Sequence, residues 1–440
     1  MPYKLVVQGG AELNGRVTIS GAKNAALPMM AAAILAKGRT VLRNVPDLSD
    51  VRLMCEILDG LGCETSFENG VVIIDVVDET PVAAPYELVS EMRASFCVLG
   101  SLLGRRKRAE VAMPGGCVLG VRPVDLHIKG FKALGAEVEV DAGNVRASGD
   151  KMRGAHIFLG GSMGPSVTGT CNVLTAATLT PGVTIIEEAA CEPEVQHLVD
   201  MLIAMGAKIQ GGGTPRLVVE GVKALKAVDC DVPPDRIEAG TFIVAAAMTR
   251  GDVVLDNVCV EHLGCVIDRF SKIGIEFERE GQTSLRVRGP EQLEAMDLTT
   301  LPYPGFPTDM QAQSMAMLSM AKGISFVCDK VYPDRFMHIP EFNRMGANIR
   351  KEGNIAIIHG ADYLSGCPVK ATDLRAGAGL VLAGLVARGK TEVLAVNYID
   401  RGYDRIEEKL KGLGANIERV ELIPRRRRTD FTPSGRLKAA

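Results

Sequence analysis

Leu134-Gly135-Ala136-Glu137-Val138 is one copy of a short phrase that occurs six times along this chain of 440 residues. In each copy an apolar residue precedes glycine, and a polar residue and often a further apolar residue follow within a few positions. Glycine readily takes the left-handed conformation that ends many helices, so each copy predicts a helix end followed by a strand. The glycines of the six copies are Gly62, Gly135, Gly206, Gly274, Gly346 and Gly414.

The spacing of these glycines indicates a repeated structural unit, because self-similarity at a nearly fixed period is typical of repeated folds. Upstream of the phrase lies a stretch rich in Ala, Met and Leu, such as Ala25–Ala36 or Gln311–Ala321. These stretches are apolar on nearly every side, which predicts buried helices. A β-type run follows each, such as Arg39–Leu42 or Ile324–Val327. Each unit therefore reads as buried helix, strand, surface helix, glycine, strand and strand.

The six units divide into three and three at Val232-Pro233-Pro234-Asp235, where two prolines interrupt regular structure. We expect a first lobe of residues 21–231 and a second lobe of residues 1–20 plus 232–423. The segment Tyr3–Ile19 reads as strand, turn and strand, and is expected to pair with the last units and close the second lobe. Residues 424–440 form a basic tail that is expected to be disordered.

Composition narrows the class of protein. The chain is 47% hydrophobic with a net charge of −3, no Trp and 4% aromatic residues. It can bury a large core, and it has neither the basic surface nor the aromatic platforms of a nucleic-acid-binding protein. The longest apolar run, Ala25–Ala36, is too short to cross a bilayer, and Met1–Lys4 does not begin a signal peptide. We therefore expect neither nucleic acid nor membrane insertion.

The cysteine and histidine patterns indicate free thiols and no metal. The eleven cysteines are scattered without a Cys-x-x-Cys pair, and the six histidines show no ligand spacing. This pattern is typical of a reducing compartment, where disulfides are rare. The expectation is a cytoplasmic, metal-independent protein without a cofactor.

The stretch Met113–His127 combines a reactive group with an anion site. Pro114-Gly115-Gly116 predicts a loop, Cys117 follows it, and Pro123 suits the first position of a helix. A loop that leads into a helix N-terminus beside Arg122 binds anions and lowers the pKa of a nearby thiol. The alternative is that Cys117 is a small buried hydrophobic residue. His127 is similarly open, as a chemical or a structural histidine.

Several motifs together resemble the enolpyruvyl transferase family. They are Gly21–Pro28, Gly115–Cys117, Phe306–Gln313, Asp373–Arg375 and Asp400–Tyr403, and the resemblance extends to about residue 423. It implies an α/β fold: a two-lobed inside-out α/β barrel of six repeated βα modules, with helices buried and sheets outside.

The resemblance also implies a reaction. The enolpyruvyl group of phosphoenolpyruvate would pass to the 3′-hydroxyl of UDP-N-acetylglucosamine by addition and elimination, with release of phosphate. This is the first committed step of peptidoglycan synthesis, and thus serves cell wall biogenesis, cell shape and cell division. Fosfomycin is the inhibitor implied. The alternatives are a shikimate-phosphate acceptor, a non-catalytic sugar-nucleotide-binding regulator, and a purely structural repeat protein. Oligomeric state stays open.

Phosphoenolpyruvate is a compact trianion, so its site needs several cations. By resemblance, Lys23, Arg122 and Arg401 face the phosphate, and Arg335 and Arg375 help to hold the carboxylate. For any one arginine the alternative is a surface ion pair.

The resemblance further implies that Cys117 is the acid that protonates the vinyl carbon and that Asp309 is the base that takes the sugar hydroxyl proton. Asp309 follows Pro307-Thr308, so a structural role at a helix N-cap or in its first turn is the alternative. Lys23 and Arg401 complete the catalytic set.

The sugar nucleotide would lie between the lobes, which must close around it with Pro233-Pro234 and Ile19–Gly21 as the hinge. By resemblance, Asn24 and Asp309 touch the amino sugar. Thr168 stands where the family usually has glycine, and its Cβ crowds a close backbone approach that Gly169 is expected to offset. The nucleotide contacts implied are Arg93, Arg122, Pro123, Val124, Asp125, Leu126, Ser166, Val167, Thr168 and Val331.

Overall fold

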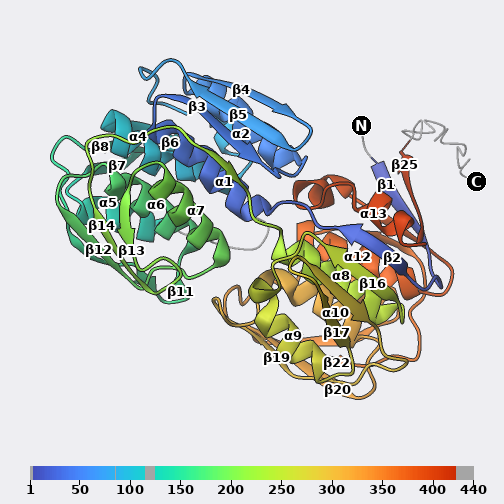
Figure 1. Cartoon of the computed structure of the whole chain (residues 1–440). Helices are drawn as coiled ribbons and strands as arrows, with labels where there is room; N and C mark the ends of the chain where they lie inside the picture. The colour runs from blue at the N-terminus through green and yellow to red at the C-terminus, as the bar shows by residue number, and fades with distance from the viewer. Residues whose placement is uncertain (1–2, 85, 114–123, 423–440) are drawn as a thin grey trace, which may run out of the picture.

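The computed structural model describes residues 3–84, 86–113 and 124–422, and its helices and strands surround two separate hydrophobic cores (Figure 1). The first core is built by side chains between Ala22 and Val232. The second is built by side chains from Leu5 to Ile19 and from Ile237 to Ile417. The chain therefore passes from one core to the other twice.

The first core has these helices and strands: α1 (Lys23–Ala32), η1 (Ala33–Leu35), β3 (Gly38–Arg43), α2 (Ser49–Gly60), β4 (Cys63–Glu68), β5 (Val71–Val76), α3 (Tyr86–Val89), η2 (Arg93–Cys97), α4 (Val98–Arg106), β6 (Arg108–Ala112), α5 (Asp125–Ala133), β7 (Glu137–Asp141), β8 (Asn144–Ser148), β9 (His156–Phe158), β10 (Gly160–Gly161), β11 (Gly164–Pro165), α6 (Val167–Thr178), β12 (Val183–Glu187), α7 (Pro193–Ala204), β13 (Lys208–Gln210), β14 (Arg216–Glu220) and β15 (Asp229–Asp231).

The second core has these: β1 (Tyr3–Gln8), β2 (Asn14–Thr18), α8 (Arg236–Met248), β16 (Asp252–Asp256), η3 (Val260–Leu263), α9 (Gly264–Ser271), β17 (Glu276–Glu280), β18 (Ser284–Arg288), β19 (Leu298–Thr300), η4 (Thr308–Met310), α10 (Gln311–Leu318), β20 (Ile324–Asp329), α11 (Ile339–Arg344), β21 (Asn348–Glu352), β22 (Ile355–His359), β23 (Pro368–Lys370), α12 (Leu374–Val386), β24 (Lys390–Leu394), η5 (Val396–Arg401), α13 (Ile406–Gly412) and β25 (Asn416–Glu421).

The same sheet pattern recurs around both cores. In β15–β3–β5–β4, for example, β15 is parallel to β3, and β5 and β4 continue the sheet in antiparallel pairs. The sheets with β9, β2, β19 and β23 at the parallel edge repeat this order. In the β6–β8–β7 sheet, a single parallel bridge between Ala83 and Glu110 of β6 takes the place of the parallel edge strand. Each edge segment comes from another unit, so the three units of each core are linked in a ring.

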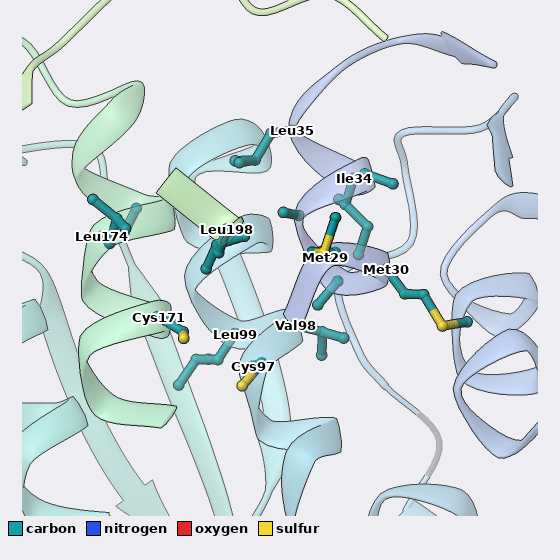
Figure 2. Close-up of a cluster of buried hydrophobic side chains, with 14 of the residues drawn as sticks. Met29, Met30, Ile34, Leu35, Cys97, Val98, Leu99, Cys171, Leu174 and Leu198 are labelled. Carbon is teal, nitrogen blue, oxygen red and sulfur yellow. The ribbon is translucent and has the colours of Figure 1, made fainter. Parts of the chain in front are cut away.

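Helices that are apolar on every side fill both cores. Every residue of α8 from Ile237 to Met248 is buried. Glycines allow such helices to approach closely: a Cβ added to Gly100 of α4 would lie 2.0 Å from the backbone oxygen of Asn172 in α6. Figure 2 shows side chains of α1, α4, α6 and α7 pointing toward one another in the first core. The predicted burial of the repeated helices is confirmed.

The repeated phrase is confirmed as a helix-to-strand turn. Its six glycines have φ between 82° and 106°, and each follows the outer helix of its unit. The chain thus folds as a mixed α/β protein in which every copy of the phrase lies at a turn from a helix to a strand.

The N-terminal segment joins two different units. β1 pairs with β24 and β25 of the last unit, as predicted. β2 instead pairs in parallel with β16 of the fourth unit, so the expectation that the whole segment joins the last units is wrong. The reason is the ring of units, in which each sheet receives its parallel edge from a neighbouring unit.

The two passages between the cores lie side by side. The amide of Ala22 donates to Pro233 O (2.7 Å), and the amide of Asp235 donates to Ser20 O (2.8 Å). Asn44 donates through Nδ2 to Val232 O at 2.9 Å, which holds one of the passages to the first core. Backbone pairing therefore couples any bending of one passage to the other.

Replacing a phrase glycine should destabilise the fold through the backbone alone. Gly346 has φ +92°, and an added Cβ would meet nothing within 4 Å. We expect Gly346→Ala to lower the free energy of unfolding by about 1–2 kcal/mol, the cost of a left-handed conformation. The matched control is Gly264→Ala, which has equal space but φ −48° at the start of α9 and should be neutral or stabilising. Urea denaturation measures both, and equal effects would contradict the prediction.

Candidate active site

A buried carboxylate joins cations from the two cores. Lys23, the first residue of α1, is 7% exposed, and its Nζ lies 2.6 Å from Oδ2 of Asp50. Arg401, at the end of η5, places Nε 2.8 Å from Oδ1 of the same Asp50. Lys23 and Asp50 belong to the first core and Arg401 to the second. We call these three residues the Asp50 cluster, and they form an ion-pair bridge between the cores.

The charge of Lys23 depends on this bridge. Burial lowers the pKa of the Lys23 ammonium, Asp50 opposes that effect, and the neighbouring Arg375 and Arg401 add to it. Without the carboxylate, the positive charge would stand unpaired in a buried place. Asp50 therefore favours the charged form of the Lys23 ammonium.

A second carboxylate holds two buried arginines. Asp309 in η4 accepts from Nη1 of Arg335 at 2.7 Å and from Nη2 of Arg375 at 3.1 Å. The two arginines are 3% and 1% exposed. We call these three residues the Asp309 cluster. Pro307 occupies the N-cap position of η4, so the N-cap role for Asp309 is wrong, whereas its place in the first turn is confirmed.

Asp329 organises the loop beside the Asp309 cluster. Its carboxylate, at the end of β20, accepts from the hydroxyls of Thr300 and Thr308, both at 2.7 Å. It also accepts from the amide of Val331 at 2.9 Å. One buried side chain therefore positions both the residue before Asp309 and Val331.

Arg375 also contacts a buried tyrosine. Its guanidinium lies 5.2 Å from the centre of the Tyr403 ring. Burial opposes the charge of Arg375, but the neighbouring Tyr403 and Asp309 outweigh it and raise its pKa. A permanent cation at this position suits an anionic ligand.

The other predicted residues are spread over several elements. Cys117, Arg122 and Pro123 lie outside the described residues. Ser166 is the N-cap of α6, and its side chain accepts from the amide of Gly169 at 3.1 Å. The remaining positions are Asn24 (exposed, α1), Arg93 (partly buried, start of η2), Val124 (buried), Asp125 (exposed) and Leu126 (partly buried) at the start of α5, Val167 and Thr168 (partly buried, start of α6) and Val331 (partly buried, after β20).

His127 is a structural, hydrogen-bonded histidine. It is 1% exposed, its Nδ1 lies 2.9 Å from Nδ2 of Asn172, and its Nε2 lies 3.3 Å from Oγ1 of Thr168. Burial lowers its pKa to about 3, so the ring is neutral near pH 7 and does not exchange protons there.

Gly169, which is expected to offset the Cβ of Thr168, packs against the protein itself. A Cβ added to Gly169 would lie 3.0 Å from the Ser166 side chain and 3.7 Å from the His127 ring. The space beside Gly169 is therefore occupied by the protein itself, and its compensation for Thr168 stays a prediction.

Asp50 is a member of the candidate site that the sequence does not identify. It reads only as an acidic residue in the first turn of a surface helix, where the helix dipole favours negative charge. Its two cationic partners lie 27 and 351 residues away along the chain. No local pattern connects positions at such separations.

The described ranges contain neither a metal-binding group of side chains nor a membrane-spanning helix. No group of three or more His, Cys, Asp or Glu side chains there is arranged to hold a metal ion. None of the helices there combines the length and the apolar character needed to cross a bilayer.

Comparison with known proteins agrees with this architecture. The sequence profile of the EPSP synthase (3-phosphoshikimate 1-carboxyvinyltransferase) family matches residues 7–410. The chain belongs to this family of enolpyruvyl transferases, which confirms the resemblance seen in the sequence.

The chain is similar in sequence to curated relatives and similar in fold to solved structures. The chain is 51% identical to UDP-N-acetylglucosamine 1-carboxyvinyltransferase 2 of Carboxydothermus hydrogenoformans, over 95% of this chain and 99% of the relative. It is also 51% identical to UDP-N-acetylglucosamine 1-carboxyvinyltransferase of Methylacidiphilum infernorum, with the same coverage. The fold matches that of the enolpyruvyl transferase NikO from Streptomyces tendae, with a TM-score of 0.85 at 22% identity, covering 95% of this chain and 99% of NikO. The fold also matches that of EPSP synthase from Acinetobacter baumannii, with a TM-score of 0.75 at 20% identity, covering 95% of this chain and 100% of that structure.

Removing the shared carboxylate should destabilise the protein strongly. We expect Asp50→Asn to lower the free energy of unfolding by about 3–5 kcal/mol, because it leaves a buried cation without its partner. Adding Lys23→Met should recover part of this loss, since the stranded ammonium is then gone.

The matched control is Asp268→Asn, which breaks the exposed pair with Lys272, whose side chains are 59% and 61% exposed. That change should cost less than about 1 kcal/mol. Urea denaturation measures all three variants, and equal losses for Asp50→Asn and Asp268→Asn would show that the Asp50 cluster has no special role in stability.

Proposed function

We propose that this protein transfers the enolpyruvyl group of phosphoenolpyruvate to the 3′-hydroxyl of UDP-N-acetylglucosamine, with release of phosphate. The observation that carries the proposal is the pair of carboxylate-held cation clusters, one at Asp50 and one at Asp309. The 51% identity to enzymes named for this reaction supports the choice of acceptor.

The two clusters suit a donor with two anionic ends. Lys23 and Arg401 would take the phosphate, and Arg335 and Arg375 would take the carboxylate. Arg122, outside the described residues, would add to the phosphate side. Cations that are already in place stabilise charge without reorganisation during the reaction.

The proton transfers would involve Cys117 and Asp309. Cys117 would protonate the vinyl carbon of the donor, and Asp309 would accept the proton of the sugar hydroxyl. In the structure Asp309 is hydrogen-bonded to Arg335 and Arg375. A donor carboxylate that draws these guanidinium groups away would free Asp309, so donor binding and base function would be coupled.

The acceptor would bind between the cores. Asn24 and Asp309 would contact its amino sugar. Its nucleotide would lie against Arg93, Arg122–Leu126, Ser166–Thr168 and Val331.

Closure of two lobes completes this proposal. The lobes would be residues 21–231 and residues 1–20 plus 232–423, each half of an inside-out α/β barrel, with 424–440 as a tail. Bending at the paired passages Ile19–Gly21 and Pro233-Pro234 would bring the clusters around the substrates and expel water.

The cellular role would follow from the reaction. As the first committed step of peptidoglycan synthesis, it would occur in the cytoplasm and support cell wall biogenesis, cell shape and division. The proposal requires no metal, cofactor, nucleic acid or membrane insertion.

The acceptor can be identified directly. With phosphoenolpyruvate and UDP-N-acetylglucosamine, the protein should release phosphate, and with shikimate 3-phosphate in its place it should not. Shikimate 3-phosphate is the relevant rival because the matching family profile is that of EPSP synthase. Phosphate release only with the rival would overturn the proposal, and release with neither would favour a non-catalytic regulator. Asp309→Ala should reduce turnover at least about 100-fold, the usual effect of losing a general base.

Fosfomycin should label Cys117 alone. The buried thiols are poor nucleophiles, because burial raises the pKa of Cys55 and Cys63 to about 11 and that of Cys97 to about 12. Peptide mapping by mass spectrometry should therefore find one modified cysteine. Asp309→Ala should retain this labelling, and Cys117→Asp should escape it while keeping a proton donor. A label on any other cysteine of the folded protein would contradict the assignment.

A further inference from the structure

Asn172 has only one possible amide orientation. It lies in α6 and is fully buried. Its Nδ2 donates to Phe96 O at 2.9 Å, and its Oδ1 accepts from the amide of Gly100 at 2.5 Å. A carbonyl needs a donor and an amide N–H needs an acceptor, so a flipped side chain would place like groups together on both sides. Nδ2 therefore also faces His127.

This orientation selects the tautomer of His127. Because Nδ1 lies 2.9 Å from the donor Nδ2 of Asn172, Nδ1 must be the acceptor. A neutral imidazole then carries its proton on Nε2. The ring packs edge-on to Phe96, with centroids 5.1 Å apart, which holds its plane.

The tautomer in turn assigns the roles of the Thr168 hydroxyl. Nε2–H of His127 donates to Oγ1 of Thr168 at 3.3 Å. A hydroxyl has a single proton, and within the described residues no acceptor for the Thr168 proton is seen. Thr168 is the second residue of α6 and is partly exposed. Its proton is therefore available to a group bound at this end of the helix.

This end of α6 faces the second core. The hairpin of β10 and β11 leads directly into α6, and a Cβ added to Gly164 of β11 would lie 3.3 Å from the Pro302 ring. Ser166 already caps the amide of Gly169, which leaves the first amides of the helix and the Thr168 hydroxyl as donors. These donors suit an anionic ligand group.

We propose that His127 is a positioning residue which, held by Asn172, makes the Thr168 hydroxyl a donor to the diphosphate of the bound sugar nucleotide. This inference rests on the proposed function and deepens it, because it assigns a recognition role to the threonine that replaces the usual glycine. Each side chain in this series donates to the next: Asn172 to His127, His127 to Thr168, and Thr168 to the ligand.

Binding of UDP and of uridine separates a diphosphate contact from a structural one. Thr168→Val keeps the shape but removes the hydroxyl, and it should weaken UDP binding about tenfold, the effect of a lost hydrogen bond to a charged group. Uridine binding should be unchanged, and Thr168→Ser should restore UDP affinity to within about twofold. Calorimetry measures each dissociation constant. An unchanged affinity of Thr168→Val for UDP, or an equal loss for uridine, would overturn the inference.

The role of His127 has its own readouts. His127→Phe should weaken UDP binding in the natural background but not in Thr168→Val, because both changes break the same contact. Additive losses would overturn the positioning role. Since His127→Phe alters a buried site, the ¹⁵N spectrum of the unaltered protein is the second test: Nδ1 should be unprotonated at neutral pH, and a protonated Nδ1 would also overturn it.

Failure of this inference can be distinguished from failure of the proposed function. If phosphate is released with UDP-N-acetylglucosamine while Thr168→Val binds UDP normally, only the inference fails. If the unaltered protein neither turns over the sugar nucleotide nor binds UDP, both fail.

Discussion

A helix that is apolar on every side must be covered on every side, and the architecture follows from this constraint. α8 and α12 expose almost nothing along their lengths, so a single sheet cannot satisfy either of them. Sheets linked in a ring around three such helices provide the cover. In α1, α8 and α12, polar groups that must contact solvent or ligand concentrate at the helix ends, because their middles are enclosed.

The predicted site residues lie where this constraint leaves room for them. Lys23 begins α1, Thr168 lies in the first turn of α6, and Arg375 lies in the first turn of α12. Asp309 lies in η4, which leads into α10. Helix N-termini carry unpaired amides and partial positive charge, so anionic ligand groups gain from meeting there. The fold thus directs several helix starts and their cations to the region between the two cores.

The clusters at Asp50 and Asp309 show how buried cations are kept ionised. Each arginine or lysine would be costly to bury alone, and each shares a carboxylate with a second cation. An anionic group of a substrate would compete with the carboxylate of each cluster for these cations. Asp50 also makes one core depend on the other, since Arg401 reaches it from the second core.

The sequence by itself determined the six units, the buried helices and the glycine turns, because these depend on local periodicity and on backbone conformations such as the left-handed φ of Gly346. Its motifs also predicted Lys23, Arg122, Arg335, Arg375 and Arg401 as a set of cations, with Asp309 as the base. Only the tertiary structure decided which cation meets which carboxylate, that Asp50 joins Lys23 and Arg401, that β2 joins the fourth unit, and that His127 contacts Thr168. These depend on contacts between residues that are distant along the chain, and no local pattern records such distances.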